Sequence, residues 1–251
     1  MFDLIKHASD LPSGCQKLAD SVSSLISTND EMFQENFAHY FSCGASALNS
    51  ILCSLSLANL KPDSILDFGC GAGRVTRWIR AAFPESNIYG YDLREIDLDF
   101  VRHNFDVITE YASINIDDME SKQSYDLIFV GSVFTHLDSK NSIKLFNKLI
   151  EWLNPKGVLI FSTHGRFVSK NGSVGNKYYG LEELKWKSLK KEYEKSGYGY
   201  KDYPGQNGYG ISLSSLIWWL NLINANKLIK INNFGEALWD SHHDIIAIQK
   251  V

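Results

Sequence analysis

The chain has 251 residues, a formal net charge of −4 and 44% hydrophobic residues, a composition typical of one globular domain, with or without a small cap. Its 25 lysines and arginines form no basic block, which argues against a nucleic-acid partner. The four cysteines lack metal-type spacing and are typical of a reduced, cytoplasmic protein. We expect neither a secretory leader nor a run of about 18 apolar residues, so no membrane span is predicted.

Residues 1–60 are predicted to form an N-terminal helical cap. Apolar side chains recur at helical spacing over residues 18–26 and again over residues 47–57. An aromatic-rich stretch, residues 37–44, lies between these two segments. This stretch is either a lid over a ligand site or a hydrophobic contact between helices, and the sequence leaves both open.

A glycine-rich turn follows a predicted strand at residues 65–68. The turn has the pattern G-x-G-x-G over residues 69–73, which lets a ligand approach the backbone at the start of the next helix. A dinucleotide fingerprint, G-x-G-x-x-G, would need glycine where Arg74 stands, and the phosphate-binding pattern G-x-x-x-x-G-K-[ST] is absent. Asp67 in the strand would repel a pyrophosphate, and it favours a ligand that carries a cation.

This segment resembles motif I of the class I S-adenosylmethionine-dependent methyltransferases, D-x-G-x-G-x-G. The resemblance covers residues 61–165 well and the C-terminal strands moderately. It implies S-adenosylmethionine as the cofactor. It also implies an α/β fold over residues 61–251, with a seven-stranded, mostly parallel, Rossmann-like methyltransferase sheet. Helices cover both faces of such a sheet, and its last strand is antiparallel.

Further segments follow in the order that this family shows. A strand at residues 87–92 ends in Asp92, a carboxylate that can accept both ribose hydroxyls at about the spacing seen in nucleotide-binding folds. After a third strand at residues 108–114, the resemblance implies a polar residue and a backbone N–H that bind adenine. Asn115 fits best, and Asp117 is the alternative.

A fourth strand at residues 125–132, a helix at 144–152 and a fifth strand at 158–163 complete the pattern. Together these segments predict a cofactor site built around the ends of the first four strands. Its predicted members are Asp67, Gly69, Cys70, Gly71, Arg74, Asp92, Leu93, Asn115, Ile116, Gly131 and Ser132.

Residues 166–210 differ from the rest, being rich in glycine, tyrosine, lysine and serine. Residues 181–195 are charged and predicted helical, whereas residues 197–200 and 203–210 are predicted loops. Because tyrosine offers both an apolar face and a hydroxyl, we predict that this insert forms a substrate surface. The alternative is a mobile surface loop.

Beyond the insert, a buried helix is predicted over residues 212–224 and strands over residues 227–234 and 244–250. The connection between the strands is too short for a helical crossover, so the pair should be antiparallel.

Histidines gather at the ligand edge of the predicted sheet. His136 follows the fourth strand, His164 ends the fifth, and His242 and His243 begin the last. Histidine titrates near neutral pH and suits proton removal from an acceptor hydroxyl, so His136, His242 and His243 are the catalytic candidates. Each could instead be a packing residue. Two or three of these histidines together could instead hold a metal ion. Because no carboxylate partner is clear, no metal is predicted.

The segment after the fourth strand bears on the acceptor. At this place, enzymes that methylate amino groups of bases often carry an Asn/Asp-Pro-Pro-aromatic motif, and C5-cytosine enzymes carry a Pro-Cys pair. Residues 131–134 of this chain match neither motif. We therefore predict O-methylation of a small-molecule or saccharide hydroxyl, with no nucleic-acid or membrane partner. A small-amine N-methyltransferase and a non-catalytic adenosylmethionine-binding module stay open, and protein acceptors are excluded only weakly. The oligomeric state is left undetermined.

Overall fold

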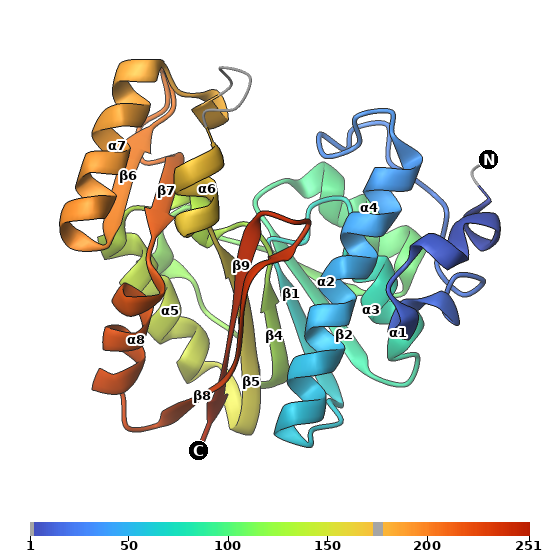
Figure 1. Cartoon of the computed structure of the whole chain (residues 1–251). Helices are drawn as coiled ribbons and strands as arrows, with labels where there is room; N and C mark the ends of the chain where they lie inside the picture. Colours follow the sequence, from blue (N-terminus) through green and yellow to red (C-terminus); the bar gives the residue numbers. More distant parts are fainter. Residues whose placement is uncertain (1–2, 173–177) are drawn as a thin grey trace.

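The computed structural model describes residues 3–172 and 178–251, and its centre is a twisted sheet of seven strands (Figure 1). The strand order is β3-β2-β1-β4-β5-β9-β8, in which β1 to β5 run parallel and β9 runs antiparallel between β5 and β8. This topology confirms the predicted fold. The strands are β1 (Ser64–Phe68), β2 (Asn87–Asp92), β3 (Ile108–Tyr111), β4 (Tyr125–Val130), β5 (Leu153–Thr163), β8 (Ile229–Trp239) and β9 (His243–Lys250).

Helices cover both faces of the sheet because the central strands are apolar on both sides. In β4, Leu127 and Phe129 pack into one core cluster and Ile128 and Val130 into the other, as the two-residue period of a strand requires. The first cluster lies under α2 (Phe37–Ala58), α3 (Thr76–Ala82) and α4 (Glu95–Phe105), and the second under α5 (Ser139–Glu151) and α8 (Leu216–Ala225).

Among the described residues, α2 is the one helix long and apolar enough to cross a membrane, a length that the sequence analysis did not anticipate. More than half of its apolar window is buried. Ala47 and Ile51 face the sheet, and Tyr40 and Leu48 face the N-terminal segment. The burial of both sides identifies α2 as a core helix. Because Tyr40 packs against the N-terminal segment, the aromatic stretch at residues 37–44 serves at least in part as a hydrophobic contact.

The helix predicted over residues 18–26 is wrong. The N-terminal segment has a 3-10 helix at Leu4–Asp10 and the short α1 (Ser13–Gln16), and then residues 17–36 are turns and irregular backbone. The physical reason is Arg77, which is 1% exposed and donates to the carbonyl oxygens of Ser23 (3.1 Å) and Leu25 (2.5 Å). A buried guanidinium thus takes backbone acceptors that a helix would use internally.

The insert is more regular than predicted. It contains α6 (Arg166–Asn171), a 3-10 turn at Tyr178–Gly180, α7 (Glu183–Ser196) and a hairpin of β6 (Tyr198–Asp202) and β7 (Gly210–Ser214). The loop predicted over residues 197–200 is therefore mostly strand. These elements share a small core of their own, and residues 173–177 of the predicted insert lie outside the described residues.

Several predicted boundaries shift. The helix predicted from Ser212 begins at Leu216, because Ser215 caps it by accepting a hydrogen bond from the Trp218 N–H (3.2 Å). β3 ends at Tyr111 rather than residue 114, and β5 begins at Leu153 rather than residue 158. The closing hairpin is antiparallel, as predicted.

Candidate active site

Two adjoining hollows open where β1, β2 and β4 end. The larger has a volume of about 560 Å³ and the smaller about 110 Å³, and they share Gly69, Gly71, Gly131 and Ser132. Such a volume suits a small-molecule ligand. Every residue predicted for the cofactor site lines one or both hollows: Asp67, Gly69, Cys70, Gly71, Arg74, Asp92, Leu93, Asn115, Ile116, Gly131 and Ser132.

The glycine turn leaves space for a ligand at Gly71. Its backbone lies in the left-handed region (φ +51°), and its N–H donates to Asp92 Oδ2 (2.8 Å). A Cβ added at this position would meet no described atom within 4 Å, so it would project into open space. Gly71 therefore combines a backbone that favours glycine with an approach path that a side chain would fill.

Asp67 lies at the floor of the smaller hollow and is only 2% exposed. Thr76 Oγ1 donates to Asp67 Oδ2 (2.6 Å), and burial raises the pKa of the Asp67 carboxyl to about 7. Arg74 lines the same hollow, with its guanidinium 6.0 Å from the centre of the Trp239 ring. The smaller hollow thus presents one basic group, Arg74, and two acidic groups, Asp67 and Asp30.

Asp92 keeps free acceptor capacity although two backbone donors already hold it. Its Oδ1 accepts from the Arg94 N–H (3.0 Å) and its Oδ2 from Gly71. A carboxylate offers about four lone-pair sites, so two hydroxyls could still be accepted. Of the two adenine candidates, Asn115 lines the larger hollow, whereas Asp117 pairs with Lys144 (2.5 Å). The geometry therefore favours Asn115.

His136 lines the larger hollow. Its Nδ1 lies 2.8 Å from the carbonyl oxygen of Gly210, which can only accept, so Nδ1 carries the proton and Nε2 keeps its lone pair. The ring stacks on Tyr209 with centroids 4.9 Å apart, and burial lowers the pKa of His136. His136 is thus a neutral imidazole with an available base nitrogen near pH 7.

Neither His242 nor His243 is among the residues that line the two hollows, although Trp239, which lines the smaller one, contacts His243. The His243 ring stacks on Trp239 (centroids 4.7 Å apart), and His242 contacts His243 (4.2 Å). His164 completes this group, 4.6 Å from the His243 ring. Of the three catalytic candidates, the structure brings His136 to the cavity.

Sequence reasoning missed several lining residues. Asp30 and Met32, from the irregular N-terminal segment, line both hollows, and Asn207 and Tyr209 of the insert line the larger one. No local pattern marks Asp30 or Met32, because long-range contacts place them. The tyrosine content of the insert marks the segment around Tyr209 as a substrate surface but does not single out Tyr209 itself.

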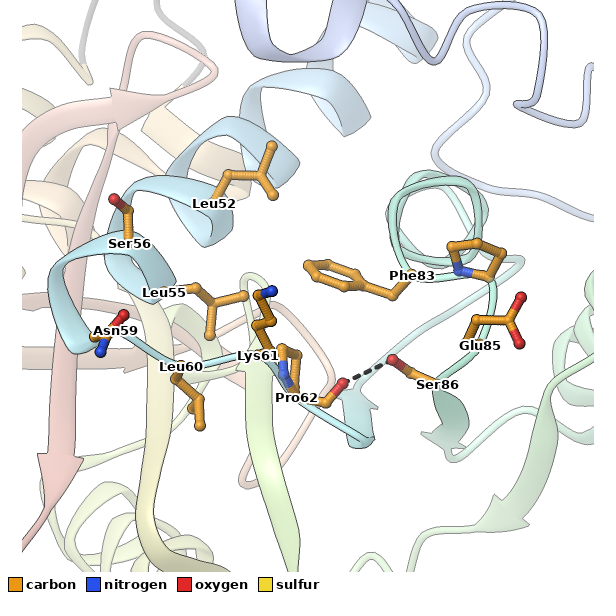
Figure 2. A pocket seen from close by; sticks show the side chains of 11 residues that line it. Leu52, Leu55, Ser56, Asn59, Leu60, Lys61, Pro62, Phe83, Glu85 and Ser86 are labelled. Carbon is orange, nitrogen blue, oxygen red and sulfur yellow. Dashed lines mark hydrogen bonds between the residues drawn. The ribbon is translucent and has the colours of Figure 1, made fainter.

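A third hollow, of about 550 Å³, lies between the C-terminal ends of α2 and α3, and Figure 2 shows the residues that line it. Leu52, Leu55 and Phe83 make it largely apolar, and Lys61 and Glu85 are its charged groups. This hollow contains none of the residues predicted for the cofactor site, so the joined hollows are the better candidate.

A family model described as "Methyltransferase domain" matches residues 38–228, most of the chain. The chain belongs to the class I S-adenosylmethionine-dependent methyltransferases. The family's cofactor is S-adenosylmethionine. The fold agrees with solved structures: an S-adenosylmethionine-dependent methyltransferase from Clostridium acetobutylicum has a TM-score of 0.58 at 15% identity, covering 82% of this chain and 91% of that one. The N-methyltransferase NodS from Bradyrhizobium japonicum, in complex with S-adenosyl-L-homocysteine, gives 0.54 at 13% identity, covering 95% and 99%.

Curated relatives of this methyltransferase are similar over part of their length. A malonyl-[acyl-carrier protein] O-methyltransferase from Acetivibrio thermocellus is 30% identical over 132 residues, which are 52% of this chain and 46% of the relative. A second enzyme of that name, from Ilyobacter polytropus, is 35% identical over 108 residues, 41% of this chain and 40% of the relative. The match thus spans about half the length of these relatives or less.

Proposed function

We propose that this methyltransferase binds S-adenosylmethionine in the joined hollows and methylates a hydroxyl oxygen of a small molecule or saccharide. The observation that carries the proposal is the state of His136, a neutral imidazole that lines the cavity. Its Nδ1–H donates to the carbonyl oxygen of Gly210, which leaves Nε2 available as a base. A hydroxyl acceptor must lose a proton during transfer, and a positioned imidazole is suited to accept it.

The lining fits the cofactor. The open space at Gly71 lets the cofactor pass close to the backbone of the glycine turn. Asp92 would accept hydrogen bonds from the ribose hydroxyls, and Asn115 would lie at the adenine. Asp67 and Arg74 in the smaller hollow match the ammonium and carboxylate of its methionine end. Asp30 and Met32 line the same space, which supports a cap role for the part of residues 1–60 that precedes the core helix α2.

The mechanism assigns each protein group one task. When bound, S-adenosylmethionine supplies an already electrophilic methyl group. His136 Nε2 takes the hydroxyl proton of the acceptor, and the Gly210 carbonyl stabilises the imidazolium through Nδ1–H. The Tyr209 ring, stacked on His136, restricts the orientation of the imidazole.

The charge of the larger hollow discriminates between acceptor classes. Asp30, Glu31, Asp92 and Asp97 line it, and its one lining arginine, Arg94, already pairs with Glu31 (3.1 Å) and Asp97 (3.3 Å). Such a lining disfavours an anionic acceptor such as a malonyl carboxylate, although the curated relatives carry malonyl names. The same carboxylates favour a small amine, which is the second candidate.

The function can be tested with methyl-labelled cofactor and three acceptor panels: hydroxyl compounds including saccharides, small amines, and carboxylates including malonyl-[acyl-carrier protein]. We expect the labelled methyl group on an acceptor from the hydroxyl panel, as a methyl ether. A methyl ether survives mild base, whereas a methyl ester is cleaved. His136→Ala should lower turnover by roughly 10²–10⁴-fold with S-adenosylhomocysteine affinity retained. His103→Ala, exposed on α4, is the control. A base-labile product, or full turnover in His136→Ala, would contradict the proposal.

The cellular setting is part of the proposal. All four cysteines are free thiols, three of them buried, which supports a reducing, cytoplasmic location.

A further inference from the structure

A buried cluster of three histidines lies beside the site but outside both hollows. His164 follows the end of β5, and His242 and His243 lie at the turn from β8 to β9. One ring nitrogen from each residue can be chosen so that all three lie within 4.8 Å of one another. Two separate parts of the chain thus bring three potential ligand atoms to one point.

The ring nitrogens of this cluster are conspicuously unpaired. His164 is 3% exposed, and among the described residues neither of its ring nitrogens has a hydrogen-bond partner. His243 is 7% exposed, and its Nδ1 likewise lacks a partner in the described chain. Buried polar atoms normally have partners, so three unpartnered nitrogens on two neighbouring rings require an explanation.

His242 already has the arrangement of a metal ligand. Its Nδ1 lies 2.7 Å from the carbonyl oxygen of Asp240, so Nδ1 is the protonated nitrogen and Nε2 keeps a lone pair. Metal-binding histidines almost always donate their other N–H to a carbonyl or carboxylate in this way, because that bond fixes the tautomer and the ring direction.

The turn that presents these histidines is strained. Asp240 and Ser241 both adopt left-handed backbone conformations (φ +50° and +56°), although neither is glycine. The turn is closed by the His242 N–H, which donates to the Trp239 carbonyl oxygen (3.2 Å). Strain of this kind is concentrated at functional sites, and the His242 and His243 ring centroids next to it lie 4.2 Å apart.

We propose that His164, His242 and His243 together bind one divalent transition-metal ion, with zinc the best match. Imidazole nitrogens suit zinc, copper and nickel, whereas calcium and magnesium prefer oxygen ligands. Tetrahedral ligation at zinc–nitrogen distances of about 2.0–2.1 Å separates the ligand nitrogens by roughly 3.4 Å, which small side-chain rotations could reach. A water molecule would fill the fourth position.

The composition of the cluster suits a metal ion. It consists of three imidazoles, two of them buried, and no lysine or arginine is part of the group. The expectation of no metal rested on the lack of a clear carboxylate partner, but three imidazoles can ligate zinc without one. The proposal is independent of the methyl acceptor and of the role of His136.

The test is metal binding by the full, untagged chain after removal of bound metal with a chelator. We expect one zinc ion per chain by elemental analysis, and Co²⁺ should produce visible absorption of the intensity typical of tetrahedral sites. His242→Ala, at a half-buried turn position, and His164→Gln should each raise the dissociation constant for zinc by roughly tenfold to a hundredfold. Circular dichroism would verify that each variant is folded.

The control is His103→Ala, which removes an exposed histidine on α4 and should keep full zinc stoichiometry. Wild-type protein that binds no zinc at micromolar concentration would overturn the proposal and leave a packed cluster of neutral imidazoles. Undiminished binding in both His242→Ala and His164→Gln would also overturn it. Because the readout is metal content, its failure is distinguishable from failure of the methyl-transfer assay.

Discussion

Gly71 offers the sharpest test at the scale of single residues, because the chain contains a matched control. Gly71 and Gly205 both have positive φ (+51° and +76°), and an added Cβ at either would meet no described atom within 4 Å. Only Gly71 of the two lines the hollows. Gly71→Leu should therefore abolish S-adenosylhomocysteine binding measured by calorimetry, whereas Gly205→Leu should keep it. Equal losses would point to backbone strain instead of an obstructed ligand path.

Asp92 allows a second test, on the adenosine side. Removing a charged acceptor from two ribose hydroxyls costs about 1.5–3 kcal/mol, so Asp92→Ala should weaken S-adenosylhomocysteine binding roughly ten- to a hundredfold. Asp92→Asn keeps one acceptor oxygen for the Arg94 N–H or for Gly71 and should lose less affinity. An unchanged dissociation constant in Asp92→Ala would remove Asp92 from the cofactor site.

Residues within the motif were predictable because their positions are fixed by a short stretch of chain. Asp67, Gly69 and Gly71 lie in one strand and its following turn, so recognising the pattern places them. Asp30 and Met32 reach the same hollow through contacts made across the fold. Choosing His136 among the three candidate histidines required the position of the larger hollow, which the sequence alone does not give.

At the scale of elements, buried Arg77 determines the path of the N-terminal segment. Besides Ser23 and Leu25, it donates to the Gly73 carbonyl oxygen (3.0 Å), and its guanidinium lies 4.8 Å from the centre of the Phe105 ring. This network anchors α3 to irregular backbone about fifty residues earlier in the chain.

Arg77→Met should therefore lower the free energy of unfolding by about 3 kcal/mol, because several buried carbonyls lose a charged donor. Urea denaturation measures this change. S-adenosylhomocysteine affinity should fall as well, since Asp30 and Met32 depend on the same segment. Arg102→Met, at a half-exposed position on α4, should change stability by less than about 0.5 kcal/mol. Similar losses in both variants would contradict the anchoring role.

Element prediction succeeded where apolar runs are short and bounded, as in β1, β2 and β4, and failed where one run covers two elements. Residues 211–223 are rich in apolar and aromatic side chains, which favours a single helix. The structure divides it into β7 and α8 at Ser215, a helix-capping residue type that was available in the sequence. The failure over residues 18–26 had no such local signal.

At the scale of the whole molecule, buried acids and buried histidines should oppose each other in the pH dependence of stability. Burial raises the pKa of Asp67 and Asp244 to about 7 and about 6, so their stabilising contribution is lost as pH rises through those values. Burial lowers the pKa of His164 and His243, so their contribution is lost as pH falls below about 6.5.

Between about pH 5 and 6 these slopes should nearly cancel in metal-free protein, which gives an almost flat free energy of unfolding. Asp67→Asn removes a carboxyl that stays protonated in the folded state in this pH range. The free energy of unfolding of the variant minus that of wild type should therefore increase by about 1.4 kcal/mol per pH unit. Denaturation curves at several pH values measure the slope. Parallel wild-type and variant profiles would show that Asp67 is ionised throughout this range.

The position of β9 has a consequence for the order in which the molecule can be completed. β9 follows β8 in the chain yet lies between β5 and β8, with Phe161 paired to Ile246. During synthesis, β1 to β5 can assemble early, but one edge of β5 stays unpaired until β9 leaves the ribosome. Trp239, His242 and His243 also arrive in that late stretch. A nascent chain halted before residue 243 would thus carry the glycine turn and Asp92 but expose an open strand edge, the feature that promotes aggregation.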